Sequence, residues 1–215
     1  MSIASFLFIV QLASETREGE LAAFDRAVAS WLEAKRGNWD GLMLGLTHGG
    51  GERSMTIICA CTVLVLLMAK QRKAATFAAV GGAGAWLLTS GLKLLFQRAR
   101  PEAVTQYLIH APSSFSFPSG HALGSTCVVG SLVVIAHAVG LPLASRMAIA
   151  VCSSAFILGV AASRVYFGVH YASDVLAGLL AGASWVAALT GWFYPQLLPG
   201  EASFSRHQRQ TDPRA

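Results

Sequence analysis

Charged side chains are scarce in this chain, which sets it apart from ordinary soluble domains. Only 13% of its 215 residues are charged, whereas 54% are hydrophobic, and a soluble domain has about 25% charged residues. The formal net charge is +5, and the basic residues do not form the stripe typical of a nucleic-acid-binding surface. The composition therefore predicts a membrane protein without a nucleic-acid partner.

The sequence also lacks the cysteine patterns and the leader that would suggest a secreted or zinc-binding protein. Its four cysteines lie inside apolar runs: Cys59, Cys61, Cys127 and Cys152. None has the pairwise spacing of a zinc site, so we expect small buried apolar residues. The apolar residues 3–13 are too few to cross a bilayer, which takes about 20 residues. They also lack the basic start and cleavage site of a signal peptide, and whether they belong to a membrane helix is left open.

Five long apolar runs make up most of the chain. They cover about residues 55–69, 74–96, 119–139, 147–162 and 171–194. Glycine and alanine are frequent within these runs, and such small residues let membrane helices approach one another closely. The sequence therefore predicts an all-α fold, a polytopic membrane helix bundle with five spanning helices.

The segment before the first long run has a different pattern. Five apolar residues share one helical face there: Leu21, Phe24, Val28, Trp31 and Leu32. Charges fill the other face, which is typical of a helix lying in the membrane interface. We expect the carboxylates between Glu15 and Glu52 to be solvated, and His48-Gly-Gly-Gly51 to break the helical pattern.

These patterns predict a single membrane-embedded domain over residues 1–215. Residues 1–54 would form an N-terminal interfacial segment or a shortened sixth span. Residues 55–195 would form the helix bundle that holds the site, and a polar tail would follow from residue 199.

The connection between the last two long runs carries a candidate nucleophile. His170 and Asp174 are four residues apart, so on a helix they share one face. A carboxylate in that position can hold one imidazole nitrogen, fix the tautomer and leave the other nitrogen free to attack. Arg164, just upstream, offers a planar set of donors suited to phosphate oxygens.

Two further stretches supply polar residues at the ends of apolar runs. Lys93 and Arg100-Pro101 close the second run, where a snorkelling basic flank is the simpler interpretation. Pro118-Ser-Gly-His121 opens the third run, where backbone N–H groups at a helix start can bind phosphate. His121 could pass a proton to a leaving oxygen there, although an incidental interfacial histidine is the alternative. With five spans, both stretches and the His170 connection would face the same side of the membrane.

This ordered trio resembles the type 2 phosphatidic acid phosphatases, or lipid phosphate phosphatases, which share their site with vanadium haloperoxidases. The family pattern is Lys, six residues, Arg-Pro; then Pro-Ser-Gly-His; then Ser-Arg, five residues, His, three residues, Asp. All three parts are present in this chain, at Lys93–Pro101, Pro118–His121 and Ser163–Asp174. Bacterial members commonly have six spanning helices, and the first one is expected to be shortened or missing here.

The resemblance implies a role for each residue that matches the pattern. His170 would attack phosphorus and form a phosphohistidine, Asp174 would orient His170, and His121 would protonate the leaving oxygen and then activate water. The remaining residues would bind phosphate without a metal or another cofactor: Lys93, Arg100, Ser119, Gly120 and Arg164. Three positive charges suit a phosphoryl group that carries about two negative charges.

The predicted function is therefore that of an integral membrane phosphatase acting on a lipid phosphate or lipid diphosphate. The alternative is a non-catalytic membrane protein that binds or moves phosphorylated lipids. Such a binder needs cations, but it needs neither a nucleophile nor an acid to orient it. A haloperoxidase fits the apolar spans poorly. The sequence indicates neither the particular lipid nor the oligomeric state.

The sidedness of the site rests on unequal arguments. Basic residues should mark the cytoplasmic side, yet seven lie on the side away from the site and nine on the side of the site. Phosphate binding accounts for Lys93, Arg100 and Arg164 among the nine. The family resemblance then favours the extracytoplasmic face of a bacterial inner membrane.

Overall fold

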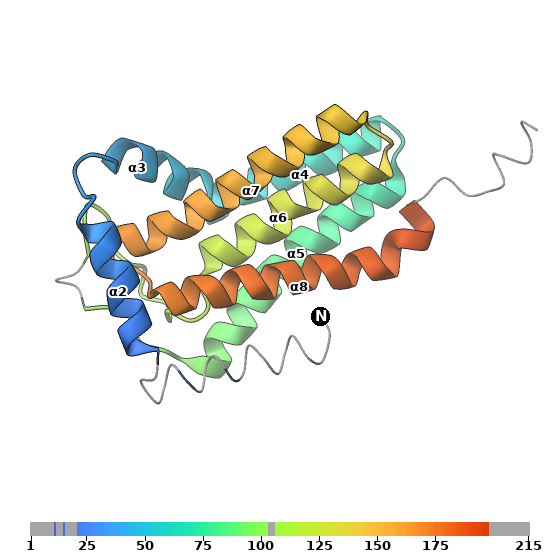
Figure 1. Cartoon of the computed structure of the whole chain (residues 1–215). Helices are drawn as coiled ribbons and strands as arrows, with labels where there is room; N and C mark the ends of the chain where they lie inside the picture. The colour runs from blue at the N-terminus through green and yellow to red at the C-terminus, as the bar shows by residue number, and fades with distance from the viewer. Residues whose placement is uncertain (1–10, 12–14, 16–20, 103–105, 198–215) are drawn as a thin grey trace, which may run out of the picture.

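The computed structural model describes residues 11, 15, 21–102 and 106–197, and in these parts the chain forms helices and loops without β-strands. The helices in chain order are α2 (Ala22–Glu33), α3 (Asp40–Gly49), α4 (Glu52–Met68), α5 (Arg72–Phe96), α6 (Gly120–Ala138), α7 (Leu143–Tyr166) and α8 (Ala172–Leu197). Helices α4 to α8 run side by side as a bundle, and α2 lies across one end of it (Figure 1). The predicted tail from residue 199 and nearly all of residues 3–13 lie outside the described residues.

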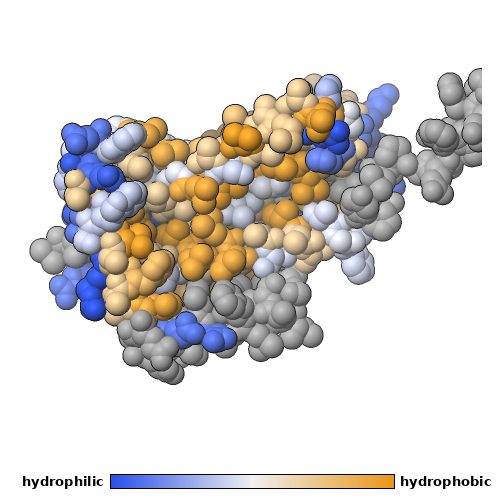
Figure 2. Space-filling model, in the orientation of Figure 1, coloured by the Kyte–Doolittle hydropathy of each residue, from blue (hydrophilic) through white to orange (hydrophobic). Residues whose placement is uncertain are grey.

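The helix lengths agree with a membrane-spanning bundle. Within the described residues, α5, α6, α7 and residues 172–193 of α8 are each long and apolar enough to cross a membrane. Helices α3 and α4 meet the same criterion together, as a pair bent by 53°. Apolar residues form a broad band over the bundle, with more polar residues towards its ends (Figure 2). The predicted all-α bundle is confirmed, and its first predicted span corresponds to α4, which meets the criterion only together with α3.

Glycine explains the break between α3 and α4. Gly50 and Gly51 lie between the two helices, inside the stretch where the sequence predicts a break. A Cβ atom on Gly50 would lie 2.3 Å from Cγ1 of Val160 in α7, so only glycine fits this close approach. The chain can therefore turn directly against α7 before α4 begins.

Small residues also bring α6 and α8 close together. A Cβ atom on Gly178 would lie 2.6 Å from the backbone oxygen of Ser119, and one on Gly182 would lie 2.7 Å from Cβ of Thr126. Close backbone approach of this kind drives helix packing where burial of apolar surface cannot. It seats the start of α6 against the first turns of α8, and both helix starts carry predicted site residues.

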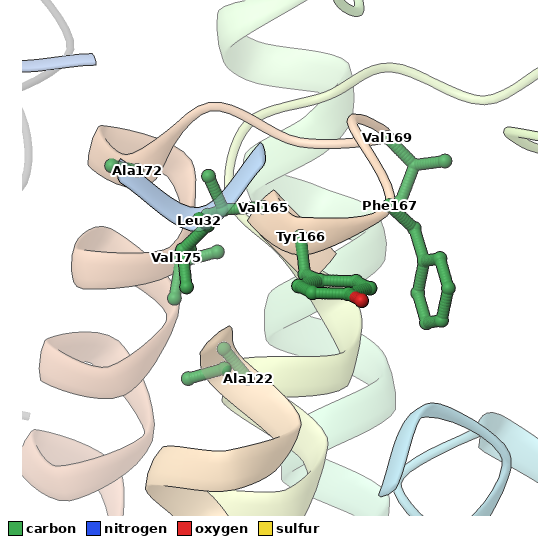
Figure 3. Packing of buried hydrophobic residues seen from close by; sticks show 9 residues of the cluster. Leu32, Ala122, Val165, Tyr166, Phe167, Val169, Ala172 and Val175 are labelled. Atoms are coloured by element: carbon green, nitrogen blue, oxygen red, sulfur yellow. The ribbon is translucent and has the colours of Figure 1, made fainter. Parts of the chain in front are cut away.

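Helix α2 is anchored to the end of the bundle that carries the site. Leu32 is buried in a cluster with Val165 of α7 and Val175 of α8 (Figure 3). Phe24 and Trp31, by contrast, are 44% and 62% exposed. The predicted single apolar face is therefore divided between the bundle and the outer surface, where aromatic residues suit a membrane interface.

Two expectations about burial are wrong. Asp25 of α2 is buried rather than solvated, because it forms an ion pair with Arg98 at 3.0 Å. Cys127 is buried as expected, but Cys61 and Cys152 are exposed. The outer faces of spanning helices meet lipid, so an apolar thiol needs no burial inside the protein there.

Candidate active site

A cavity of about 850 Å³ connects the loop end of the bundle with the space between α4, α5 and α6. Six of the eight predicted site residues line it: Lys93, Arg100, Gly120, His121, Arg164 and His170. Ser119 and Asp174 are fully buried and lie behind this lining. The structure thus brings residues from three helices and two loops together at the polar end of one cavity.

The rest of the cavity is mainly apolar and follows the helices into the bundle, although its lining also includes Glu52, Thr56, Thr89 and Ser90. Its lining on α5 runs from Lys93 to Ala79, about 21 Å at 1.5 Å per residue. Leu64 and Leu67 of α4 and Trp86 of α5 also line it, and these residues are 58%, 50% and 61% exposed on the outside of the bundle. The cavity therefore extends from the polar site to the surface that would face lipid.

His170 lies in the short connection between α7 and α8, where it meets Arg100. Nη1 of Arg100 is 3.0 Å from Nε2 of His170. A guanidinium group can only donate hydrogen bonds, so Nε2 accepts and the ring proton resides on Nδ1. Oδ2 of Asp174 lies 3.4 Å from Nδ1. In this tautomer the unprotonated nitrogen lies on the side of Arg100 and the protonated one on the side of the carboxylate.

The environment also keeps His170 neutral. Burial, the largest influence, lowers the pKa of His170 to about 4, against the opposing effect of the nearby Asp174 carboxylate. The positive charges of Arg100 and Arg164 lower this pKa further. At neutral pH the imidazole is therefore unprotonated at Nε2, as a nucleophile requires.

Asp174 is fixed by donors that the sequence did not indicate. Its Oδ2 accepts hydrogen bonds from the Ser116 hydroxyl at 2.5 Å and from the Tyr171 N–H at 2.9 Å. Its Oδ1 accepts one from Nη1 of Arg98 at 2.6 Å. Arg98 and Arg100 lie in the loop that follows α5, and no spacing rule links either Arg98 or Ser116 to Asp174. Both residues come from the connection between α5 and α6, which is long for a loop in a compact domain, and such loops are often functional.

The backbone N–H group of Ser119 already has a hydrogen-bond partner within the protein. Its N–H donates to the carbonyl oxygen of Asp174 at 2.9 Å, so the expectation that this N–H is available for phosphate is wrong. The contact is a consequence of the close packing of α6 on α8. Gly120 opens α6, so the N–H groups of its first turn lack helical partners.

The loop before α6 holds two of the cations in place. Nζ of Lys93 donates to the Ser114 hydroxyl at 3.0 Å, and Nε of Arg100 donates to the Ser114 carbonyl at 2.7 Å. Nη1 of Arg100 also donates to the carbonyl oxygen of Val169 at 2.9 Å. Ser114 therefore contacts both cations and, together with Val169, sets the positions of Lys93 and Arg100 relative to His170.

Arg164 and Ser119 present buried polar atoms that suit an anion. Arg164 is 4% exposed, and its Nη1 donates to the hydroxyl of Thr47 in α3. Its Nε and the Ser119 hydroxyl are buried without a hydrogen-bond partner among the described residues. Buried polar groups are nearly always satisfied, and phosphate oxygens would satisfy these two.

His121 occupies the first turn of α6 and lines the cavity beside the break between α3 and α4. Its Nε2 would lie 3.7 Å from a Cβ atom on Gly51, so this part of the wall is bare backbone. The ring thus has room next to the cations, at the position that the sequence predicts for a proton donor.

A membrane helix bundle holds this group of cations and histidines, and the chain is similar to proteins of a known family. Residues 74–197 match the family model described as PAP2 superfamily, and the chain belongs to this superfamily. It is 30% identical to phosphatidylglycerophosphatase B of Bacillus subtilis (strain 168), over 84% of this chain and 88% of the relative. It is 32% identical to an undecaprenyl-diphosphatase of Sulfolobus acidocaldarius, over 70% of this chain and 68% of that protein.

The fold is also similar to that of a solved structure of this family. The crystal structure of a transmembrane PAP2 type phosphatidylglycerolphosphate phosphatase from Bacillus subtilis matches it with a TM-score of 0.79. The sequence identity is 26%, and the match covers 88% of this chain and 94% of that one. The predicted family is confirmed, and the protein is an integral membrane protein. The roles of the individual site residues stay predictions.

Proposed function

We propose that this protein hydrolyses the terminal phosphate of a lipid phosphate or lipid diphosphate. One observation carries the proposal: a cluster of cations and histidines, in which Arg164 and His170 are buried and the others half-buried, forms one end of a mainly apolar cavity that reaches the lipid-facing surface. A phosphorylated lipid has the same division into a charged head and an apolar tail. The relatives are named as enzymes that remove phosphate from such molecules.

Substrate binding would depend on charge. A terminal phosphate carries about two negative charges near neutral pH, and Lys93, Arg100 and Arg164 line the polar end of the cavity. Nε of Arg164 and the Ser119 hydroxyl have no hydrogen-bond partner in the described part of the chain, and both would donate to phosphate oxygens. N–H groups in the first turn of α6, where Gly120 begins the helix, would donate as well. These donors would stabilise the charge on the equatorial oxygens during transfer.

The chemical steps would use both histidines. Nε2 of His170 would form a bond to phosphorus while the bond to the leaving oxygen breaks, and His121 would give that oxygen a proton. Asp174, next to Nδ1, would stabilise the positive ring of the phosphohistidine. His121 would then take a proton from water as the water oxygen bonds to phosphorus. The phosphorus–nitrogen bond breaks in this step, phosphate leaves and His170 is restored.

The site would lie on the extracytoplasmic face of a bacterial inner membrane, within a single membrane-embedded domain. The substrate would enter from the lipid between α4 and α5, where Leu64 and Trp86 line the cavity. The three cations would provide the positive charge that a metal ion provides in other phosphatases, so the reaction would need no cofactor.

A panel of lipids tests the proposal. Purified protein in detergent should release phosphate from at least one of phosphatidic acid, phosphatidylglycerol phosphate, undecaprenyl diphosphate and a lipid A phosphate. Brief incubation with the labelled substrate should give a protein adduct that is labile to acid and stable to base. His170→Ala should abolish the adduct and turnover, whereas His110→Ala, a change of an exposed loop histidine, should preserve both. Binding of these lipids without phosphate release would instead support a non-catalytic binding protein.

A further inference from the structure

Helix α2 carries a buried carboxylate to the edge of the site, and the mechanism above gives it no role. Asp25 is 5% exposed, although it lies in a helix on the outside of the bundle. Its Oδ2 is 3.0 Å from Nη2 of Arg98 and accepts a hydrogen bond from the Ser173 hydroxyl at 2.8 Å. Its Oδ1 accepts the Ser173 N–H at 2.8 Å. A buried charge with three donors costs desolvation, which these contacts offset.

Arg98, which pairs with Asp25, also contacts Asp174. Nη1 of Arg98 donates to Oδ1 of Asp174 at 2.6 Å and to the Ser173 hydroxyl at 2.8 Å. The guanidinium group therefore bridges two carboxylates, and it lies 4.0 Å above the ring of Tyr171. Asp174 is thus connected to α2 through a single arginine and the neighbouring serine.

Asp25 also supports the helix start on which Asp174 is located. Ser173 is the second residue of α8, and its N–H is one of the first-turn donors without a helical acceptor. Asp25 satisfies this N–H from another helix, and a carboxylate there is favoured by the helix dipole. Asp174 in turn satisfies the N–H of Tyr171. The first turn of α8 is therefore held by one carboxylate of its own and one from α2.

We infer that Asp25 is a positioning residue for the phosphoryl transfer proposed above. Through Arg98 and Ser173 it keeps Asp174 in the orientation in which Oδ2 lies next to His170. Its negative charge also offsets that of Arg98, so the Asp174 carboxylate remains available to stabilise the positive imidazole ring that forms on attack. This inference rests on the proposed function.

A purely structural role would have different consequences. If Asp25 only fastened α2 to the bundle, its loss would lower the melting temperature and leave the kinetics of the folded enzyme unchanged. A positioning role acts on the chemical step, so it lowers kcat and leaves KM nearly constant. The two roles can therefore be separated by kinetics.

The test is a pair of variants measured on the lipid phosphate that the wild type hydrolyses. Asp25→Asn keeps the size of the side chain and removes its charge. It should lower kcat and the rate of phosphohistidine formation by about tenfold or more, as for the loss of a hydrogen bond to a charged group, with KM unchanged. In an Arg98→Met background the same change should lower kcat by a smaller factor, because the link through Arg98 is already lost and only the contacts with Ser173 remain.

Glu33→Gln on the same helix is the matched control. Glu33 pairs with Arg36 at 3.3 Å, and its side chain is 39% exposed. Removing this surface ion pair should leave kcat unchanged. If it lowered kcat as much as Asp25→Asn does, any disturbance of α2 would suffice and the inference would be wrong.

The remaining outcomes distinguish a positioning role of Asp25 from a purely structural one. Wild-type kcat in Asp25→Asn, or equal losses in the wild-type and Arg98→Met backgrounds, would overturn the inference alone. If Asp25→Asn does not fold, Ser173→Ala replaces it, because this change removes one link and keeps both charges. It should also lower kcat at constant KM, and a wild-type kcat would overturn the inference. Wild-type protein that releases no phosphate would overturn the proposed function itself.

Discussion

Gly124 offers the sharpest test of whether the cavity accommodates a lipid tail. It lies one turn beyond His121 in α6 and lines the cavity, and a Cβ atom there would meet nothing within 4 Å. Gly124→Leu should therefore fill part of the cavity without displacing atoms of the protein.

The expected effect is steric. A lipid tail already lies among apolar chains in the membrane, so the cavity adds little affinity by burying it. Forcing extra methylene groups into occupied space costs about 1–3 kcal/mol. At 1.4 kcal/mol per factor of ten, kcat/KM for a long-chain phosphatidic acid should fall by about 5- to 150-fold. Glycerol 3-phosphate has no tail, so its kcat/KM should be nearly unchanged.

The assay compares these two substrates in detergent, with phosphate release as the measurement. Gly91→Leu is the matched control, because Gly91 is an exposed position of α5 where a Cβ atom also meets nothing within 4 Å. It should leave both substrates unaffected. An equal loss for both substrates in Gly124→Leu would refute the reasoning, since the added side chain would then disturb the phosphate end.

Four shorter predictions address other parts of the site. Thr47→Val should lower the free energy of unfolding by about 1–3 kcal/mol, because the buried Arg164 loses an acceptor; an unchanged Tm in detergent would contradict this. Activity should persist in EDTA and be inhibited by vanadate, which adopts the five-coordinate geometry of in-line transfer; activity lost in EDTA and restored by Mg²⁺ would count against the mechanism. The ring of His170 should remain neutral as the pH falls from 7 to 5 and become protonated near its pKa of about 4, and a ¹⁵N NMR midpoint near 6.5 would disprove this. Labelling of cysteines tests which side of the membrane the site faces. In a cysteine-free background, Ser113→Cys, at an exposed loop position, should react with an impermeant thiol reagent in intact cells, and Lys73→Cys should not. The reverse pattern would place the site on the cytoplasmic face.

The parts of the site that depend on local spacing could be predicted from the sequence. His170 and Asp174 are four residues apart, and the short connection and first turn of α8 that hold them follow directly on an apolar run. Five long runs place alternate helix ends on one side, so Lys93, Arg100 and His121 had to face the same side as His170. This alternation is a consequence of chain connectivity, so predicting it requires no knowledge of how the helices pack.

The residues that support the site could not be predicted in this way. Arg98 and Asp25 are 73 residues apart, and Arg164 and Thr47 are 117 apart. These pairs form only because α2 and α3 fold back onto the site end of the bundle, which apolar periodicity does not reveal. In the sequence, Asp25 is a lone carboxylate on an amphipathic helix, and such a residue is expected to face solvent. Only the packing of the helix shows that it is buried.

The cavity adjoins two different surroundings, which matters for what happens after cleavage. Pro112 and Ser114 of the exposed loop line one end, and Leu64 and Leu67 line the part that faces lipid. Cleavage of a lipid phosphate gives one charged product and one apolar product, so phosphate can leave towards water while the lipid moves sideways into the membrane. In the mechanism above the lipid product leaves first, since water must take its place before the phosphohistidine is hydrolysed and phosphate is released. Added inorganic phosphate should therefore compete with the substrate, whereas neutral lipid that accumulates in the bilayer should not slow turnover.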